Sequence, residues 1–263
     1  MSKDHQAFKA EQTGLKTEEL KELFQTGEIA AEAHGDYVNA LLIFQKIVKL
    51  DHETLRQHGV LPWMAWIYLG FCNYKLGRWE EAREAYELAI SIWEGQRFGR
   101  FYMELGWVYS KLGRNLEMFE AFREAARLDP DPEIMYGLGL ACSLTQQYEQ
   151  QVWALKKAIQ EKPDFAEAYY LLGDGYSNLG YRRSAIKAFT RAVQLKPDHA
   201  KAHFQLGLAY LSVNNEVLAH KQYKILKSSD RALANTLINL INGVDPNNEK
   251  AKNRGPHHEV EAF

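Results

Sequence analysis

The chain is 263 residues long, with 46% hydrophobic residues, 25% charged residues and a formal net charge of -2. These proportions are typical of a folded soluble protein, and the small net charge disfavours attraction to nucleic acid or to an anionic membrane surface. Its two cysteines, Cys72 and Cys142, are far apart in the sequence, so we expect neither a disulfide framework nor a metal site from them.

Residues 1–16, at the start of the chain, are predicted to form a flexible arm. The stretch from Met1 to Glu11 is polar and lacks the apolar core of a secretory signal. No run in the chain approaches the roughly 18–20 apolar residues that would span a bilayer. We therefore expect a cytoplasmic protein that is not inserted into a membrane.

A helical pattern repeats along most of the chain. A leucine–glycine step marks the first helix of each clear copy, and the glycine-to-glycine spacings are 36, 33, 34 and 34 residues. The steps are Leu69-Gly70, Leu105-Gly106, Leu138-Gly139, Leu172-Gly173 and Leu206-Gly207. A period close to 34 residues with helical patterning predicts stacked helix–turn–helix units.

Residues 17–62 precede the clear copies. Residues 17–50 are predicted to form a degenerate first unit, whose second helix fits the pattern through Tyr37 and Phe44. The first helix of this unit has Gly27 and Glu28 where the leucine–glycine step should stand, so it does not fit. Residues 51–62 are expected to form an inserted surface loop.

The clear copies and the end of the chain follow in order. The predicted full units are 63–98, 99–131, 132–165, 166–199 and 200–228. A capping helix is expected over 229–242, because Ser229 or Asp230 can cap a helix that carries leucines at helical spacing. Residues 243–263 are polar and are predicted to form a flexible tail.

The repeated residues resemble the tetratricopeptide repeat family, and the resemblance covers roughly residues 21–228. It implies an all-α fold, a right-handed superhelical solenoid of about six helix–turn–helix hairpins with a C-terminal capping helix. Prolines that stop helices close three of the copies, at Pro130, Pro163 and Pro197. The family serves many unrelated partners, so the resemblance implies protein binding without naming a partner.

In this family the first helices of successive hairpins line a concave groove where many ligands bind. The resemblance implies two groove positions on each first helix, one helical turn apart. They are Ile67, Phe71, Met103, Trp107, Tyr136, Leu140, Tyr170, Asp174, Phe204 and Leu208. Nine of the ten are apolar or aromatic, so we expect a partner with apolar anchors. Asp174 is expected either to be solvated or to contact a lysine, arginine or backbone amide of the partner.

Three cations, Lys75, Arg100 and Lys111, are expected at the edge of this groove. Some family members hold the terminal carboxylates of a partner with Lys, Asn and Arg at the groove positions. This chain has Ile67, Phe71 and other apolar residues there, so it departs from that pattern. Its edge cations would hold a carboxylate only in a different geometry.

We therefore expect a non-catalytic scaffold or adaptor that binds a peptide, a helix or a subunit in an apolar groove. Two alternatives stay open: a homo-oligomeric assembly protein, in which the groove meets another copy, and a regulatory subunit of an enzyme complex.

No phosphate loop, nucleophile elbow or zinc-protease motif is present, so no catalytic residue, metal or cofactor is expected. The His257-His258-Glu259 run lacks the spacing of a metal site. The two cysteines are expected to be inert buried thiols, and Trp153 is expected on the outer face.

Overall fold

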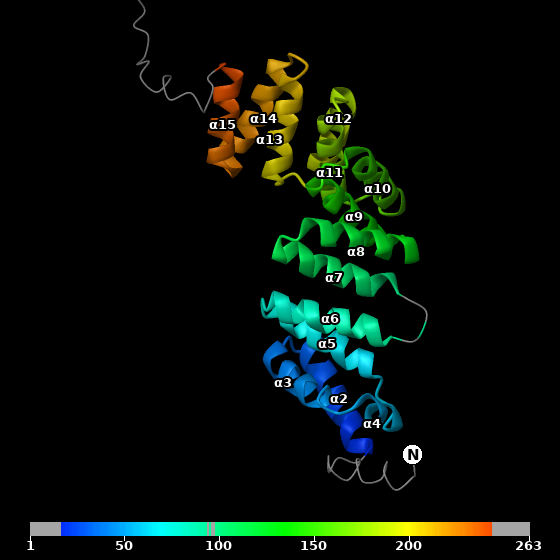
Figure 1. Ribbon diagram of the computed structural model, residues 1–263. Helices are drawn as coiled ribbons and strands as arrows, with labels where there is room; N and C mark the ends of the chain where they lie inside the picture. Colours follow the sequence, from blue (N-terminus) through cyan, green and yellow to red (C-terminus); the bar gives the residue numbers. More distant parts are fainter. Residues whose placement is uncertain (1–16, 94, 96–97, 244–263) are drawn as a thin grey trace, which may run out of the picture. The chain divides into compact units, whose positions relative to one another are not determined.

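The computed structural model describes residues 17–93, 95 and 98–243. Over these ranges the chain has fourteen α-helices and no strand, and the helices follow one another as hairpins (Figure 1). The predicted all-α fold is thereby confirmed. The predicted arm and residues 244–263, with the His257-His258-Glu259 run, lie outside the described residues.

The chain forms two compact units, Met1–Ala141 and Cys142–Phe263, here called the N-terminal unit and the C-terminal unit. The division falls within α9 (Pro132–Leu144). The helices before it are α2 (Thr17–Glu32), α3 (Tyr37–Ile47), α4 (His52–Gln57), α5 (Pro62–Lys75), α6 (Trp79–Ile92), α7 (Gly99–Leu112) and α8 (Asn115–Leu128). The helices after it are α10 (Tyr148–Glu161), α11 (Ala166–Asn178), α12 (Arg182–Leu195), α13 (Ala200–Leu211), α14 (Glu216–Ser229) and α15 (Arg231–Ile241).

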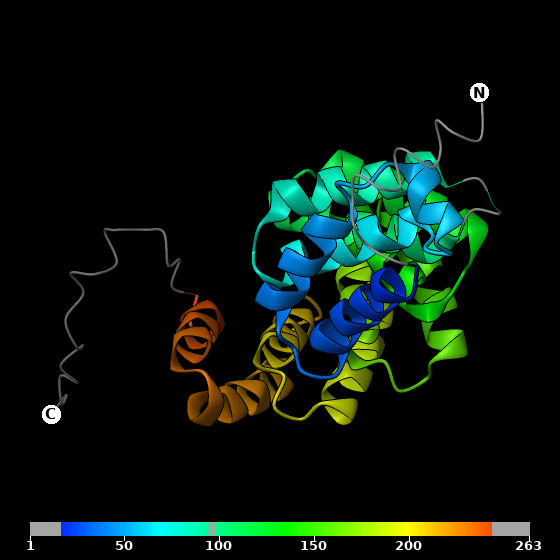
Figure 2. The same ribbon diagram turned by 90° about the horizontal axis from the view of Figure 1, so that it is seen from below.

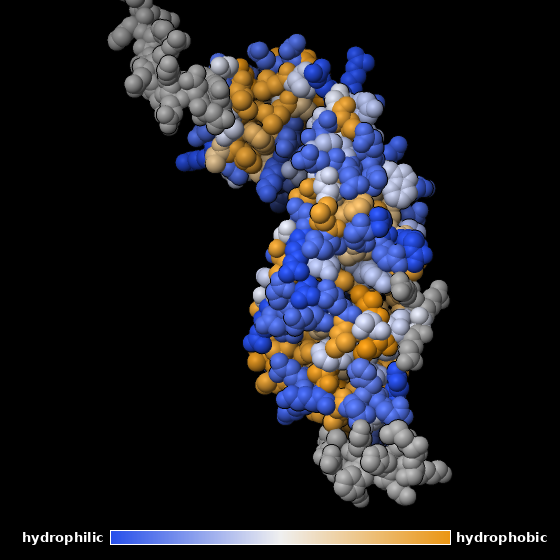
Figure 3. Space-filling view, in the orientation of Figure 1, coloured by the Kyte–Doolittle hydropathy of each residue, from blue (hydrophilic) through white to orange (hydrophobic). Residues whose placement is uncertain are grey.

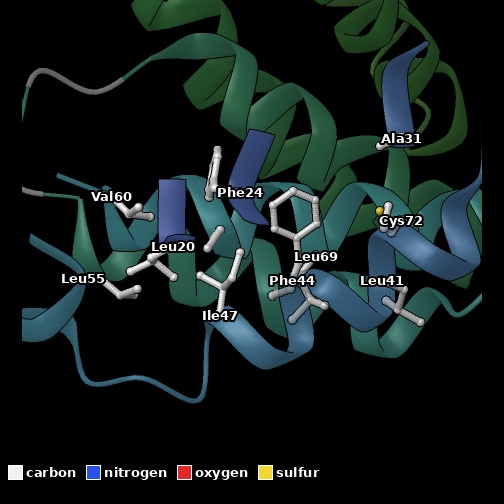
Figure 4. Close-up of a cluster of buried hydrophobic side chains, with 13 residues drawn as sticks. Leu20, Phe24, Ala31, Leu41, Phe44, Ile47, Leu55, Val60, Leu69 and Cys72 are labelled. Carbon is white, nitrogen blue, oxygen red and sulfur yellow. The ribbon is translucent and has the colours of Figure 1, made fainter. Parts of the chain in front are cut away.

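The N-terminal unit is built from the hairpins α2–α3, α5–α6 and α7–α8. Each hairpin contacts the next, through α3 against α5 and α6 against α7. Seen from below in Figure 2, the α2–α3 pair lies beside α5. A cluster of buried apolar side chains, which includes Leu20, Phe44 and Leu69, joins these first three elements (Figure 4).

The α2 helix shows why the first unit folds although its leucine–glycine step is missing. Gly27 is buried in α2, and a Cβ atom built on it would lie 2.8 Å from the Cζ atom of Phe44 on α3. The same relation holds between Gly70 and Tyr86, whose ring atoms would lie 3.1 Å from an added Cβ. Gly27 therefore supplies the close helix approach in this unit, although the leucine–glycine step itself is absent.

Residues 51–62 were expected to form a loop, but the structure places α4 within them. The Asp51 carboxylate caps this helix, because it accepts hydrogen bonds from the Thr54 backbone N–H at 3.0 Å and from the Thr54 hydroxyl at 2.7 Å. Leu55 is fully buried in the first apolar cluster, beside Val60 (Figure 4). With six residues, α4 is too short for hydrophobic periodicity in the sequence to reveal it.

The hairpin turns share one backbone conformation. Gly77, Gly113 and Gly180 have φ angles of 75°, 70° and 76°. Two further turns use non-glycine residues at the same place, Gln146 with φ 60° and Asn214 with φ 58°. The left-handed conformation is easy for glycine and costs roughly 1–2 kcal/mol for other residues, with asparagine better tolerated than most.

The C-terminal unit contains the hairpins α11–α12 and α13–α14, with α10 packed on α11 and α15 packed on both α13 and α14. Ala185 and Ala192 are buried on α12. The α15 helix begins after Asp230, whose carboxylate accepts hydrogen bonds from the backbone N–H groups of Ala232 and Leu233, both at 3.1 Å. Of the two capping residues that the sequence offers, Asp230 is therefore the one used.

Candidate functional site

The N-terminal unit contains a pocket of about 340 Å³ on its first helices. Residues of α5 and α7 form most of its lining, with one residue each from α2 and α6. Its walls are mainly aromatic, and the rings are those of Trp63, Tyr68, Phe71, Tyr86 and Phe101. Met64 and Ile67 add aliphatic surface. A concave, mostly apolar site with a few polar groups is the usual form of a binding site.

Contacts behind the pocket hold its aromatic walls in place. The Tyr68 ring stacks on Phe44 with a centroid distance of 5.0 Å and an interplanar angle of 7°. The Phe71 ring meets the edge of Tyr37 at 5.8 Å, and Trp63 lies 5.4 Å from Phe101. These rings therefore contact one another and the core on one side while they line the pocket on the other.

Three charged side chains, Glu32, Arg100 and Glu104, complete the lining. The Tyr68 hydroxyl donates a hydrogen bond to Glu32 Oε1 at 2.8 Å. Burial and this hydrogen bond raise the pKa of Tyr68. Arg100 Nε lies 4.0 Å from Glu104 Oε1, and the Arg100 side chain is 79% exposed whereas that of Glu104 is 26% exposed. Burial raises the pKa of Glu104, although Arg100 and Lys75 act against that rise.

The predicted groove residues of the N-terminal unit are all half-buried, and the structure gathers only some of them. Ile67 and Phe71 line the pocket together with Arg100. Trp107 instead packs on Phe122, with ring centroids 4.9 Å apart, and lies 6.2 Å from Tyr136. The half-buried Met103 and Leu140 are not part of the pocket lining.

The predicted groove residues of the C-terminal unit also combine packing with exposure. The Tyr170 ring lies 6.0 Å from Phe189 and 5.0 Å from His199. Phe204 and Leu208 pack against the cluster formed with Leu237 of α15, so the last helix covers part of each. Apolar surface remains visible over α13, α14 and α15 on the face drawn in Figure 3.

Asp174 is half-buried rather than fully solvated. Its carboxylate accepts long hydrogen bonds from Ser143 Oγ at 3.3 Å, Asn178 Nδ2 at 3.4 Å and Gln151 Nε2 at 3.5 Å. All these donors are neutral and belong to the C-terminal unit. Asp174 is therefore held by neutral hydrogen-bond donors beside an otherwise apolar row.

Family models decide what kind of protein this is. One tetratricopeptide repeat model matches residues 63–129, and another matches residues 166–199. This chain is a tetratricopeptide repeat (TPR) protein. Its sequence has no significant match among curated proteins.

Solved structures share the fold of this TPR protein. The crystal structure of MamA is 26% identical, with a TM-score of 0.58, and the match covers 64% of this chain and 97% of that chain. MamA from Desulfovibrio magneticus RS-1 is 22% identical, with a TM-score of 0.60 and coverage of 65% and 96%. YrrB, described as a TPR protein with an unusual peptide-binding site, is 21% identical, with a TM-score of 0.61 and coverage of 73% and 95%.

The three predicted edge cations of the TPR protein occupy different surroundings. Only Arg100 lines the pocket. Lys75 Nζ lies 5.2 Å from the centroid of Phe71, and Lys111 Nζ lies 6.0 Å from the centroid of Trp79. Lys111 is therefore associated with the start of α6 and not with the pocket.

The predicted groove and edge positions missed seven of the ten residues that line the pocket: Glu32, Trp63, Met64, Tyr68, Tyr86, Phe101 and Glu104. Trp63 stands one helical turn before Ile67, so one more turn of the same register on α5 would have found it. Glu32 carries no such signal, because it comes from α2, and only the packing of α2 near α5 brings it to the pocket.

Other side chains offer little reactive chemistry. Cys72 and Cys142 are buried free thiols, and burial raises their pKa values to about 11 and about 12. Such thiols are poor nucleophiles at neutral pH. Among the described residues no group of His, Cys, Asp and Glu is arranged to hold a metal ion.

None of the described helices combines the length and the apolar character needed to cross a bilayer.

Trp153, which was expected on the outer face, is 55% exposed on α10.

Proposed function

We propose that this TPR protein is a non-catalytic scaffold or adaptor that binds a peptide, a helix or a subunit of another protein through its first helices. TPR proteins mediate protein–protein interactions, and the repeat typically carries no catalytic activity. The observation that carries the proposal for this chain is the pocket of about 340 Å³ on α5 and α7. Its volume suits one or two side chains of a partner segment, which is how anchor residues bind.

Partial exposure of the predicted groove residues supports the same proposal. All ten lie between the buried and the exposed extremes, so each keeps part of its surface accessible. Aromatic residues in this state contribute large contact areas at a small loss of side-chain freedom. The peptide-binding site described for YrrB belongs to that protein, and the likeness supports the fold of this chain alone.

The test is affinity capture from a lysate of the source cells with quantitative mass spectrometry. A Trp63→Ala/Phe101→Ala double variant removes two pocket walls, and we expect it to lose the captured partner. The matched control is Leu116→Ala/Val217→Ala, which removes two exposed apolar side chains on the second helices α8 and α14. Equal capture by wild type and the pocket variant would contradict the proposal.

A second variant protects this test against loss of folding. Arg100→Glu reverses a charge at the pocket on a side chain that is 79% exposed, so the melting temperature should change little. Sedimentation velocity on the purified wild type then identifies the occupant. A dimer that the double variant converts to a monomer would mean that the pocket binds another copy of this chain.

A further inference from the structure

The pocket combines aromatic walls with two carboxylates, which is unusual for a site that would take only an apolar anchor. Among the described residues that line it, Glu32 and Glu104 carry carboxylates and Arg100 is the one cation. Aromatic faces attract cations because their π-systems are negative at the centre. The chain itself supplies an example, since the Lys75 ammonium lies over the Phe71 ring at 5.2 Å.

Glu104 is a carboxylate whose charge is only weakly compensated. Its side chain is only 26% exposed, and its ion pair with Arg100 has an N–O separation of 4.0 Å, the limit for such a pair. The Arg100 side chain extends into solvent, where water screens its charge. Burial consequently raises the pKa of Glu104 despite Arg100 and Lys75. A further cation inside the pocket would offset the desolvation of this carboxylate.

Glu32 is held in position for the same task. Its Oε1 atom accepts a hydrogen bond from the Tyr68 hydroxyl at 2.8 Å. Tyr68 is itself fixed, because its ring stacks on Phe44 at 5.0 Å and meets the edge of Phe24 at 5.8 Å. The carboxylate is therefore oriented before any ligand arrives, which lowers the entropy lost on binding.

From these contacts we infer that the pocket binds a lysine or arginine side chain of the partner protein. The methylene groups of that side chain pack on the aromatic walls, and its charged end meets the carboxylates of Glu104 and Glu32. The inference rests on the proposed function and names the partner's chemistry. A carboxylate held by the three edge cations is a different arrangement; Lys111 is not at the pocket, and the Arg100 side chain is mostly in solvent.

Three small probes test the charge preference directly: n-pentylammonium, 1-pentanol and pentanoate. They share an alkyl chain and differ in charge, so apolar packing alone predicts similar binding. The readouts in NMR titrations are the Trp63 indole N–H and the side-chain carboxyl ¹³C signal of Glu104. We expect pentylammonium to bind at least about threefold more tightly than 1-pentanol, and pentanoate to bind weakest. Equal binding of the three, or tighter binding of pentanoate, would overturn the inference.

Two pocket variants should change pentylammonium binding in opposite directions. Glu104→Gln should weaken it about threefold or more, and Arg100→Gln should strengthen it, because it removes a like charge. The matched control is Glu161→Gln, an exposed position on α10 in the C-terminal unit, which should leave binding unchanged. Binding that Glu104→Gln leaves unaltered would also overturn the inference.

A failure of this inference can be distinguished from a failure of the proposed function. If the probes show no charge preference while the Trp63→Ala/Phe101→Ala variant still loses its partner, the pocket binds proteins through an apolar anchor and only this inference fails. If the double variant captures its partner normally, the proposed function fails whatever the probes show.

Discussion

Phe122 is the residue that most clearly shows how tightly the hairpins pack. It is fully buried on α8, and two helical glycines approach its ring. A Cβ atom built on Gly106 of α7 would lie 2.7 Å from the ring, and one built on Gly137 of α9 would lie 2.1 Å from it. Both distances are well inside van der Waals contact, so glycine is required at each position by the ring and not by the backbone.

Gly137→Ala should therefore destabilise the protein. Overpacking a filled core costs about 1–3 kcal/mol, and the contact distance of 2.1 Å places this site in the upper part of that range. The gain in helix propensity returns only up to about 1 kcal/mol. Chemical denaturation should show a lower midpoint than for the wild type.

The matched variant is Gly70→Ala, where the added Cβ lies 3.1 Å from the Tyr86 ring. There the milder contact and the propensity gain oppose each other, so the change should stay within about 1 kcal/mol. If Gly70→Ala destabilised the protein as much as Gly137→Ala, contact distance would not be the cause.

Glu104 gives a pH-dependent prediction at the same scale. Burial raises its pKa in the native state, so the native state favours the protonated form. The stabilisation that goes with protonation is complete below the unfolded pKa of about 4.3 and disappears as the pH rises through the higher native pKa. At neutral pH the carboxylate therefore opposes folding, with Arg100 and Lys75 reducing the penalty.

Glu104→Gln should raise the melting temperature of the free protein at pH 7 and leave it nearly unchanged at pH 3. The effect should not exceed about 1 kcal/mol, because the side chain retains contact with water. Thermal denaturation followed by circular dichroism at both pH values measures it, with Glu161→Gln as the control. A lower melting temperature at pH 7 would mean that the ion pair with Arg100 outweighs the cost of burial.

At the scale of elements, local sequence signals predict most of the helices. The turns between them depend on the backbone conformation of single residues. The turns that contain Gly77, Gly113 and Gly180 were recognisable from the glycine alone. The turn at Gln146 was not, because glutamine gives no signal for a φ angle of 60°. The α4 helix was missed for a related reason, since its six residues are secured by the Asp51 cap and by the burial of Leu55.

Gln146→Gly should stabilise the protein. Glycine removes the cost of the left-handed conformation, roughly 1–2 kcal/mol, and gives back about 0.4–1 kcal/mol through greater freedom of the unfolded chain. We expect a net gain of about 0.5 kcal/mol, measured by chemical denaturation. The control is Gln150→Gly, an exposed position inside α10, which should lose about 1 kcal/mol. A loss of stability in both variants would exclude the explanation that glycine relieves the left-handed conformation at position 146.

At the scale of the whole molecule, helices within each unit contact mainly their neighbours along the chain, with a few contacts to the helices beyond these, such as α13 with α15. Stability in such an array is approximately the sum of local hairpin terms and interfaces between neighbours. The end of the array then depends on its last helix. The α15 helix covers Leu226 and packs Leu237 against α13, where a Cβ on Gly207 would lie 2.6 Å from Leu237 Cδ2.

Asp230→Ala should consequently loosen the C-terminal end without affecting the pocket. Loss of the two capping hydrogen bonds costs about 1 kcal/mol. Native-state hydrogen exchange should accelerate in α13, α14 and α15 and stay unchanged in α5 and α7, because opening propagates through neighbouring elements. Asp36→Ala removes the cap of α3 and should give the converse pattern. Uniform acceleration along the chain would show global rather than local unfolding.

The sequence by itself determined the succession and the period of the helical hairpins. These features depend on residues within one period of about 34 positions, and helical geometry alone translates that spacing into contacts. It also placed Ile67, Phe71 and Arg100 at what became the pocket.

Only the tertiary structure decided which predicted groove residues keep an open surface and which are covered by neighbours, such as Phe204 and Leu208 beneath α15. It alone brought Glu32 of α2 to the pocket that Glu104 of α7 lines. The physical reason is that burial, and with it the charge state of a carboxylate, depends on every element packed around a side chain, whereas periodicity reports only the face of the helix on which that side chain begins.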